Sequence, residues 1–258
     1  MKLPIAIIGI GELGSVFARA FLHAGYPVYP VTRGMDIPDT MAQIPEPVLT
    51  LLAVTEKDLP GVLKQLPPGD LENIGLLQNE LLPDVWLSNG IVSPTVISVW
   101  FEKKKGMDVK ALRPSPVYGP RAALIVNALE SVELPCRCLA DENELLFELV
   151  VKNVFVYMVN ICGLKTGGTT GILWTKHSAL ARQVADEIID LQEALTATSF
   201  SRPALIKGVE EGIEGDPNHK CTGRSAPGRL TRFISMADQA CIRAETIRAI
   251  QSETLKKQ

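Results

Sequence analysis

The start of the chain, where an apolar run leads directly into closely spaced glycines, constrains the fold most strongly. Residues 3–8 are mostly apolar and rich in isoleucine, which is typical of a strand buried on both faces. Gly9, Gly11 and Gly14 follow at once, and apolar residues then recur at helical spacing over residues 15–24. The pattern therefore predicts a strand, a tight glycine turn and a helix.

A second strand is predicted over residues 26–32, which completes a βαβ unit of the kind that binds dinucleotides. In such a unit Gly9 permits the tight turn, Gly11 lets the backbone approach a pyrophosphate, and Gly14 lets the helix pack closely on the strand. The N–H groups and the dipole at the helix start then favour an anion. The predicted cofactor-binding residues of this turn are Gly9, Ile10, Gly11, Glu12, Leu13 and Gly14.

The residues after the second predicted strand indicate which dinucleotide binds. NAD-binding proteins usually carry an acidic residue there, which accepts hydrogen bonds from the ribose hydroxyls. This chain has Thr32 and Arg33 instead, and its first carboxylate beyond them is Asp36. Because an arginine can pair with a 2′-phosphate and stack on adenine, the sequence favours NADP over NAD.

The rest of the chain changes character near residue 140. Before that point, strands are predicted over residues 48–54, 73–78, 91–93, 96–101 and near Val117, with a helix-like segment over 57–65 and an exposed hairpin tip at 103–106. After it, Asp141 and Glu144 form a capping-box pattern that opens a long apolar helix over residues 145–162. Further helices are predicted over residues 173–198, 201–208 and 230–255, with a glycine-rich interhelical turn at 163–171 and a loop at 210–228.

These patterns predict an α/β protein with two domains. Residues 1–140 are expected to form a Rossmann-type NADP-binding domain, and residues 141–258 an all-helical domain for substrate binding or dimerisation. A small molecule is expected to bind in the cleft between such domains.

Composition excludes several classes of protein. The formal net charge is −3 and aromatic residues make up 5% of the chain, so no nucleic-acid partner is expected. No apolar run reaches the roughly 18 to 20 residues that span a bilayer, so no membrane partner is expected either. The 5 cysteines are read as small buried residues of a reduced, cytoplasmic protein, because they show no metal-ligand spacing. His23, His177 and His219 show no catalytic partner at a recognisable spacing.

Further residues make the chain resemble the ketopantoate reductases (2-dehydropantoate 2-reductases), as a distant and shortened member. The matching segments are the glycine turn with Arg33, Thr55-Glu56-Lys57, Leu77-Gln78-Asn79, Gly119-Pro120-Arg121, Thr170-Gly171-Ile172-Leu173, and the helix that carries Lys152 and Asn160. In that family a lysine follows the third strand, and a catalytic lysine is followed eight residues later by an asparagine. The resemblance implies that Thr55, Lys57 and Asn79 contact the cofactor and that Lys152, Asn160 and Asn79 serve catalysis.

The spacing of Lys152 and Asn160 has a physical meaning of its own. Together with Val156 they occupy successive i, i+4 positions, so all three lie along one stripe of a helix. A lysine and an asparagine on an otherwise apolar helix must find polar partners or face a cleft. The alternative is a lysine at the helix edge whose stem is buried and whose ammonium group lies in solvent.

The sequence departs from the family at two positions. Glu80 follows Asn79 where the family usually has glycine. Ser225 can stand for the family's serine near the last helix, but the glutamate expected about twelve residues later falls near Met236. Asp238 and Glu245 are poorly aligned substitutes for it. Because Met236 cannot accept a strong hydrogen bond, the resemblance implies a substrate with fewer hydroxyls than ketopantoate.

The function expected from these residues is NADPH-dependent reduction of a small 2-oxo acid or related carbonyl, with a homodimer as a possible assembly. Two alternatives stay open. One is an NADP-binding sensor or scaffold without catalysis, which the missing glutamate favours and the pair Lys152 and Asn160 disfavours. The other is an imine or hydroxy-acid oxidoreductase with the same two-domain plan, in which Ser93 or the Asn89-Gly90 turn would matter more than Lys152.

Overall fold

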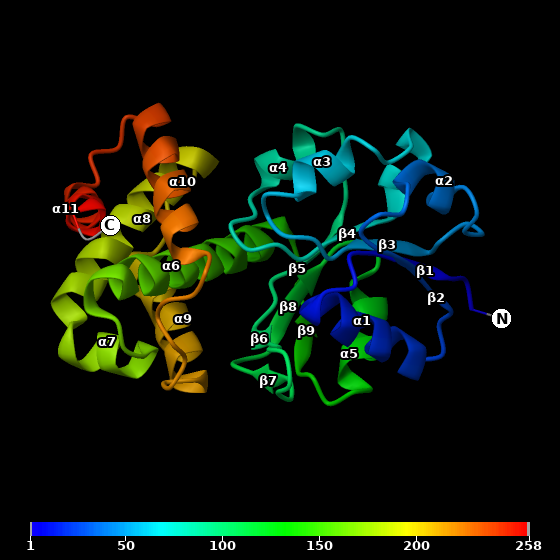
Figure 1. Ribbon diagram of the computed structural model, residues 1–258, viewed down its shortest axis with the longest axis horizontal. Helices are drawn as coiled ribbons and strands as arrows, with labels where there is room; N and C mark the ends of the chain where they lie inside the picture. The colour runs from blue at the N-terminus through cyan, green and yellow to red at the C-terminus, as the bar shows by residue number, and fades with distance from the viewer. Residues whose placement is uncertain (1, 257–258) are drawn as a thin grey trace. The chain divides into compact units, whose positions relative to one another are not determined.

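The computed structural model describes residues 2–256 and divides into two compact units, residues 1–148 and residues 149–258 (Figure 1). The first unit contains a sheet of seven strands in the order β2-β1-β3-β4-β5-β8-β9. The strands are β1 (Ile5–Ile8), β2 (Val28–Val31), β3 (Leu49–Leu52), β4 (Ile74–Leu76), β5 (Thr95–Ile97), β8 (Ser115–Tyr118) and β9 (Cys136–Cys138). All neighbouring pairs are parallel except β5 and β8, which are antiparallel.

Helices cover both faces of this sheet. Figure 1 shows α1 (Glu12–His23) and α5 (Ala122–Glu130) on one face, and α2 (Ile37–Met41), α3 (Leu59–Leu63) and α4 (Pro83–Leu87) on the other. The core beneath α1 and α5 contains Phe17 and Phe21, which pack against the fully buried strands β1 and β3. This is the doubly wound arrangement that buried parallel strands require, because both of their faces must be covered.

The first unit also holds segments that the sequence pattern did not predict. Helix α5 and strand β9 were not expected, and the strand predicted over residues 91–93 is wrong. Those residues form a bend in which Val92 is 84% exposed, directly before Pro94. The hairpin tip at 103–106 is confirmed, between β6 (Phe101–Glu102) and β7 (Lys110–Ala111). A 3-10 helix, η1 (Pro68–Asn73), precedes β4.

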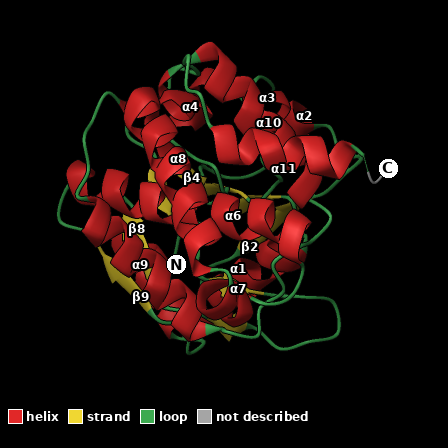
Figure 2. Ribbon diagram, turned by 90° about the vertical axis from the view of Figure 1, so that its left-hand side faces the viewer, coloured by secondary structure: helices red, strands yellow, loops and turns green. Residues whose placement is uncertain are grey.

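The second unit is built of helices and connecting loops (Figure 2). Its helices are the greater part of α6 (Glu142–Thr166), α7 (Thr170–Lys176), α8 (Ser178–Thr196), α9 (Arg202–Gly215), α10 (Ala226–Gln239) and α11 (Glu245–Leu255). The expected fold class, a Rossmann-type α/β sheet followed by a helical part, is therefore confirmed.

Two long helices of the prediction are each split in the structure. Residues 173–198 divide at His177, whose backbone leaves the helical region between α7 and α8. Residues 230–255 divide between α10 and α11, where Cys241 and Ala244 have φ of 56° and 48°. Helix α9 is also longer than predicted and takes up part of the expected loop. These breaks lack the glycine or proline that usually marks a helix end in a sequence.

Helix α6 begins as its capping pattern predicts. The Asp141 Oδ1 atom accepts hydrogen bonds from the backbone N–H groups of Asn143 and Glu144, at 2.8 and 2.9 Å. The Glu144 carboxylate accepts one in return from the N–H of Ala140, at 2.9 Å. The division between the units falls later than residue 140, inside α6. The first turns of this helix belong to the first unit, where Glu148 forms ion pairs with Arg113 and Arg137.

Helix α6 is the one helix of the described chain that is long and apolar enough to cross a membrane by composition. Its most apolar stretch is, however, 83% buried inside the structure. Burial of this extent is typical of the core helix of a soluble protein, since a membrane span would present its apolar surface to lipid.

Candidate nucleotide-binding and catalytic residues

The glycines after β1 have the geometry that a dinucleotide turn requires. Gly9 has φ of +101°, and a Cβ atom there would lie 2.7 Å from the carbonyl oxygen of Ala53. A Cβ at Gly14 would overlap the carbonyl oxygen of Gly9, so α1 can approach β1 only with glycine at this position. A Cβ at Gly11 would meet nothing within 4 Å. The turn is thus closed on its inner side and open at Gly11, as a cradle for a phosphate must be.

A groove of about 910 Å³ runs along this turn and the neighbouring strand ends. Of the predicted cofactor residues it is lined by Gly9, Ile10, Gly11, Thr32, Arg33, Thr55 and Lys57. The side chains of Arg33 and Lys57 are exposed, so two cationic groups flank the groove. Helix α1 begins at Glu12 without a side-chain cap, so its first N–H groups face this region.

Four other predicted cofactor residues are not among those that line the groove: Glu12, Leu13, Gly14 and Asn79. Leu13 packs against the apolar core and Gly14 is buried beneath the turn, whereas Glu12 is exposed at the helix start. Thr55 lines the groove, but its hydroxyl donates to the Asp58 carboxylate at 2.7 Å, at the start of α3. These residues shape the turn, and the backbone of Gly9 to Gly11 forms its open side.

The carboxyl ends of β3 and β4 are tied together by two side chains. Gln78 is 7% exposed, and its Nε2 donates to the carbonyls of Leu52 and Val54 at 2.6 and 3.2 Å. The next residue, Asn79, donates from Nδ2 to the Oε1 of Glu56 at 3.0 Å. Sequence reasoning did not assign a role to Glu56 or Gln78.

Glu80 has a left-handed backbone conformation, with φ of +62°. Glycine adopts this conformation without strain, which explains why the resembled family usually has glycine at this position. The turn after Asn79 thus places a non-glycine residue in a conformation that favours glycine.

Lys152 and Asn160 lie where the helical spacing predicts, on one stripe of α6 with Val156 between them. Both polar side chains are half-buried, whereas Val156 is 7% exposed. The Lys152 Nζ atom lies 5.8 Å from the centre of the Phe155 ring, a cation–π contact that fixes its stem along the helix.

Asn160 belongs to a polar cluster with Arg229 and Ser225, from helix α10 and its N-cap. Arg229 is 8% exposed, and its Nη1 donates to the Asn160 Oδ1 at 2.8 Å and to the Ser225 Oγ at 2.9 Å. The Asn160 Nδ2 points toward the Cys221 carbonyl, at 3.4 Å. One lone pair of the Asn160 oxygen thus accepts from a guanidinium, and the amide N–H groups remain the donors that Asn160 can offer to a ligand. Arg229 was missed in the sequence, and Ser225 was noted only through the resemblance.

The two carboxylates considered as substitutes for the family's glutamate have other surroundings. Asp238 forms an exposed ion pair with Arg248 at 2.5 Å, and Glu245 lies in the first turn of α11. Met236, at the position of that glutamate, is half-buried.

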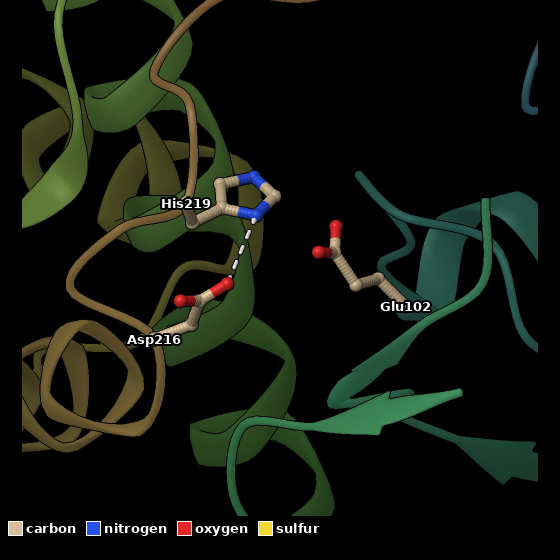
Figure 3. A group of neighbouring side chains, drawn as sticks. All are labelled: Glu102, Asp216 and His219. Carbon is tan, nitrogen blue, oxygen red and sulfur yellow. Dashed lines mark ion pairs between the residues drawn. The ribbon is translucent and has the colours of Figure 1, made fainter. Parts of the chain in front are cut away.

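One histidine has a carboxylate partner that the sequence spacing did not reveal. The His219 Nδ1 lies 3.9 Å from the Asp216 Oδ2, and Figure 3 shows the two side chains facing each other. Thr170 ties this loop to α7, because its hydroxyl donates to the Asp216 carbonyl at 2.7 Å. Both residues lie in the loop that connects α9 to α10.

The expectation that all cysteines are buried is wrong for two of them. Cys162 and Cys221 are buried, and Cys136 is half-buried, but Cys138 and Cys241 are exposed. Cys138 is the third residue of a three-residue strand, β9, and Cys241 lies in the turn after α10, so neither is covered by packing.

We expect only Cys138 and Cys241 to react quickly with a thiol reagent at pH 8. Burial raises the pKa of Cys136 and of Cys162 to about 12, and that of Cys221 to about 11. Since the thiolate is the reactive form, these three stay protonated and unreactive in the folded protein. Titration with a chromogenic disulfide should give two fast thiols in buffer and five in guanidinium chloride. Fast reaction of a third thiol would contradict the burial of Cys136, Cys162 or Cys221.

The sequence matches no protein-family model and no curated protein sequence, but the fold has close structural relatives. A 2-dehydropantoate 2-reductase from Methylococcus capsulatus superimposes with a TM-score of 0.74 at 14% identity, over 97% of this chain and 95% of that one. A probable 2-dehydropantoate 2-reductase from Bacillus subtilis gives 0.69 at 16% identity, over 99% and 100%. D-mandelate dehydrogenase, in a complex with NADH and anilino(oxo)acetate, gives 0.70 at 12% identity, over 99% and 98%. The predicted resemblance in fold to ketopantoate reductases is thus confirmed.

Proposed function

We propose that the protein is an NADP-dependent oxidoreductase of the ketopantoate reductase type, which reduces a small 2-oxo acid or a related carbonyl. The observation that carries the proposal is the glycine turn, which is closed at Gly9 and Gly14 and open at Gly11 beside a groove flanked by two cations. The fold shared with 2-dehydropantoate 2-reductases and D-mandelate dehydrogenase supports it. A cytoplasmic location and a homodimer are part of the same proposal.

The residues of the groove suit NADP. The backbone around Gly11 and the start of α1 would hold the pyrophosphate, because N–H groups at a helix start favour an anion. Arg33, at the carboxyl end of β2, would hold the 2′-phosphate of the adenosine half. When bound in reduced form, the cofactor supplies a hydride to the substrate carbonyl carbon.

The chain's own part in the chemistry belongs to Lys152 and Asn160. The Lys152 ammonium protonates the carbonyl oxygen as that oxygen becomes an alkoxide, which is the role of a general acid. Asn160 donates toward the substrate from its amide nitrogen, while its oxygen accepts from Arg229. Asn79 orients the reactants at the carboxyl end of β4.

The charge of the Asn160 cluster favours an acidic substrate. A buried guanidinium attracts a carboxylate strongly, since charge-assisted hydrogen bonds are strongest where water is scarce. The 2-oxo acids are therefore the first substrates to test, with related neutral carbonyls as the comparison. The test is steady-state reduction by NADPH of a panel of 2-oxo acids, with apolar members beside ketopantoate and with the methyl esters as neutral controls.

Replacing Arg33 with alanine is expected to narrow the preference for NADP over NAD. The loss of a charge-assisted contact to the 2′-phosphate costs about 1.5 to 3 kcal/mol, so NADP(H) affinity falls while NAD(H) affinity changes little. Calorimetric dissociation constants for both nucleotides test this, with Arg19→Ala as the control because Arg19 is an exposed arginine on α1. Equal affinity of the wild type for the two nucleotides would refute the choice of NADP.

The second candidate is an NADP-binding sensor without catalysis. The observation that favours it is Met236, which occupies the position of the family's glutamate. A wild-type protein that binds NADPH but reduces no member of a broad carbonyl panel would favour this alternative.

A further inference from the structure

Glu56 places a carboxylate at the carboxyl edge of the sheet, directly after β3. Its Oε1 accepts a hydrogen bond of 3.0 Å from the Asn79 Nδ2, which follows the neighbouring strand β4. The side chain is half-buried, unlike that of the next residue, Lys57, which is exposed to water. A half-buried charge is screened less than an exposed one and acts over a longer range on its surroundings.

The hydrogen bond between Glu56 and Asn79 lies next to a second connection between the same two strand ends, which Gln78 makes. Gln78 is buried, and its amide bonds to the carbonyls of Leu52 and Val54 fix the end of β4 against the end of β3. Asn79 therefore cannot rotate freely, and the bond to Glu56 determines which end of its amide faces that carboxylate. A negative charge is thus held at a fixed point of this edge.

The strand order indicates which part of a dinucleotide meets this charge. The glycine turn follows β1, and Arg33, which marks the adenosine end, follows β2. The sheet continues on the other side of β1 with β3 and then β4. A dinucleotide that crosses this edge with its adenosine half at β2 extends its nicotinamide half toward β3 and β4, where Glu56 and Asn79 lie.

We propose that Glu56 is a specificity-determining and positioning residue that makes the site favour the oxidised nicotinamide cofactor. The nicotinamide ring is a cation in NADP⁺ and neutral in NADPH, so a fixed carboxylate near it stabilises the oxidised form selectively. Glu56 also orients Asn79 toward the reactants. This inference rests on the proposed function. Its consequences are that hydride transfer out of NADPH, which creates this cation, is favoured in the reduction of a 2-oxo acid, and that the protein then releases NADP⁺ slowly.

The test compares the dissociation constants of NADP⁺ and NADPH, measured by calorimetry at low salt. Glu56→Gln is expected to weaken NADP⁺ binding about three- to tenfold and to leave NADPH binding within about twofold. Glu56→Asp keeps the charge and should keep most of the preference. Glu46→Gln is the matched control, because the exposed Glu46 precedes β3 and so lies at the opposite end of the same strand.

Each result of this experiment decides a different question. Retained NADPH binding shows that the Glu56→Gln protein is folded and has an intact groove. An equal change in both affinities, or no change in either, would overturn the role of Glu56 while the proposed function stands. A wild-type protein that binds neither nucleotide would overturn the proposed function and this inference with it.

Discussion

Lys152→Ala is expected to reduce turnover of a 2-oxo acid by about 10²- to 10⁴-fold, the range typical for removal of a general acid. Affinity for NADPH should change little, because the proposed role of the lysine is toward the substrate oxygen rather than toward the dinucleotide. The variant should fold, because Lys152 is half-buried on α6 and alanine is the best helix former. Steady-state kinetics with NADPH, with nucleotide affinity measured in parallel, provides the check.

The matched control for this variant is Lys165→Ala. Lys165 lies on the same helix, but its ammonium pairs with Glu253 at 2.7 Å on the surface of the second unit. It should keep wild-type turnover, since an exposed ion pair contributes little to stability and none to the chemistry. Unchanged turnover in Lys152→Ala would remove Lys152 from the mechanism and would make Asn160 a binding residue only.

The part of the fold that the sequence predicted best is the part in which backbone geometry allows few residues. Gly9 must be glycine because of its φ, and Gly14 because any Cβ would overlap the Gly9 carbonyl. The strand before the turn and the helix after it follow from simple apolar periodicity. The start of α6 could also be predicted, because the capping residues Asp141 and Glu144 bond only to backbone groups within four residues of them.

The errors occurred where distant packing decides local structure. The break at Cys241 and Ala244 uses left-handed residues that are not glycine, so no local signal marks it. In the candidate site, Arg229 was missed because its partner Asn160 lies 69 residues away in the sequence. Glu56 was missed as a functional residue for the same reason, since Asn79 follows it by 23 residues. Apolar periodicity and helix caps can be recognised in a single sequence because they involve neighbouring residues. Contacts between distant residues form only when the strands and helices pack together, so they could not be predicted.

Glu148→Ala is expected to lower the free energy of unfolding by about 3 kcal/mol. Glu148 is 6% exposed and forms ion pairs with Arg113 and with Arg137, the latter at 2.5 Å. Arg113 is itself nearly buried, and its guanidinium lies 4.6 Å from the centre of the Trp100 ring. Removing one partner of a buried ion pair costs about 3 to 5 kcal/mol, because the remaining charge stays out of water without its counterion. The Arg137 guanidinium is half-exposed, so water can solvate it when Glu148 is removed. The expected loss in the free energy of unfolding is therefore at the lower end of this range of about 3 to 5 kcal/mol.

Chemical denaturation followed by circular dichroism measures this loss. Glu142→Ala removes the same charge from the exposed first turn of the same helix and should cost only a few tenths of a kcal/mol. The double variant Glu148→Ala with Arg113→Met should recover part of the loss, because an apolar side chain beside Trp100 needs no counterion. A Glu148→Ala protein as stable as Glu142→Ala would mean that the ion pairs of Glu148 with Arg113 and Arg137 contribute little to the stability of the fold.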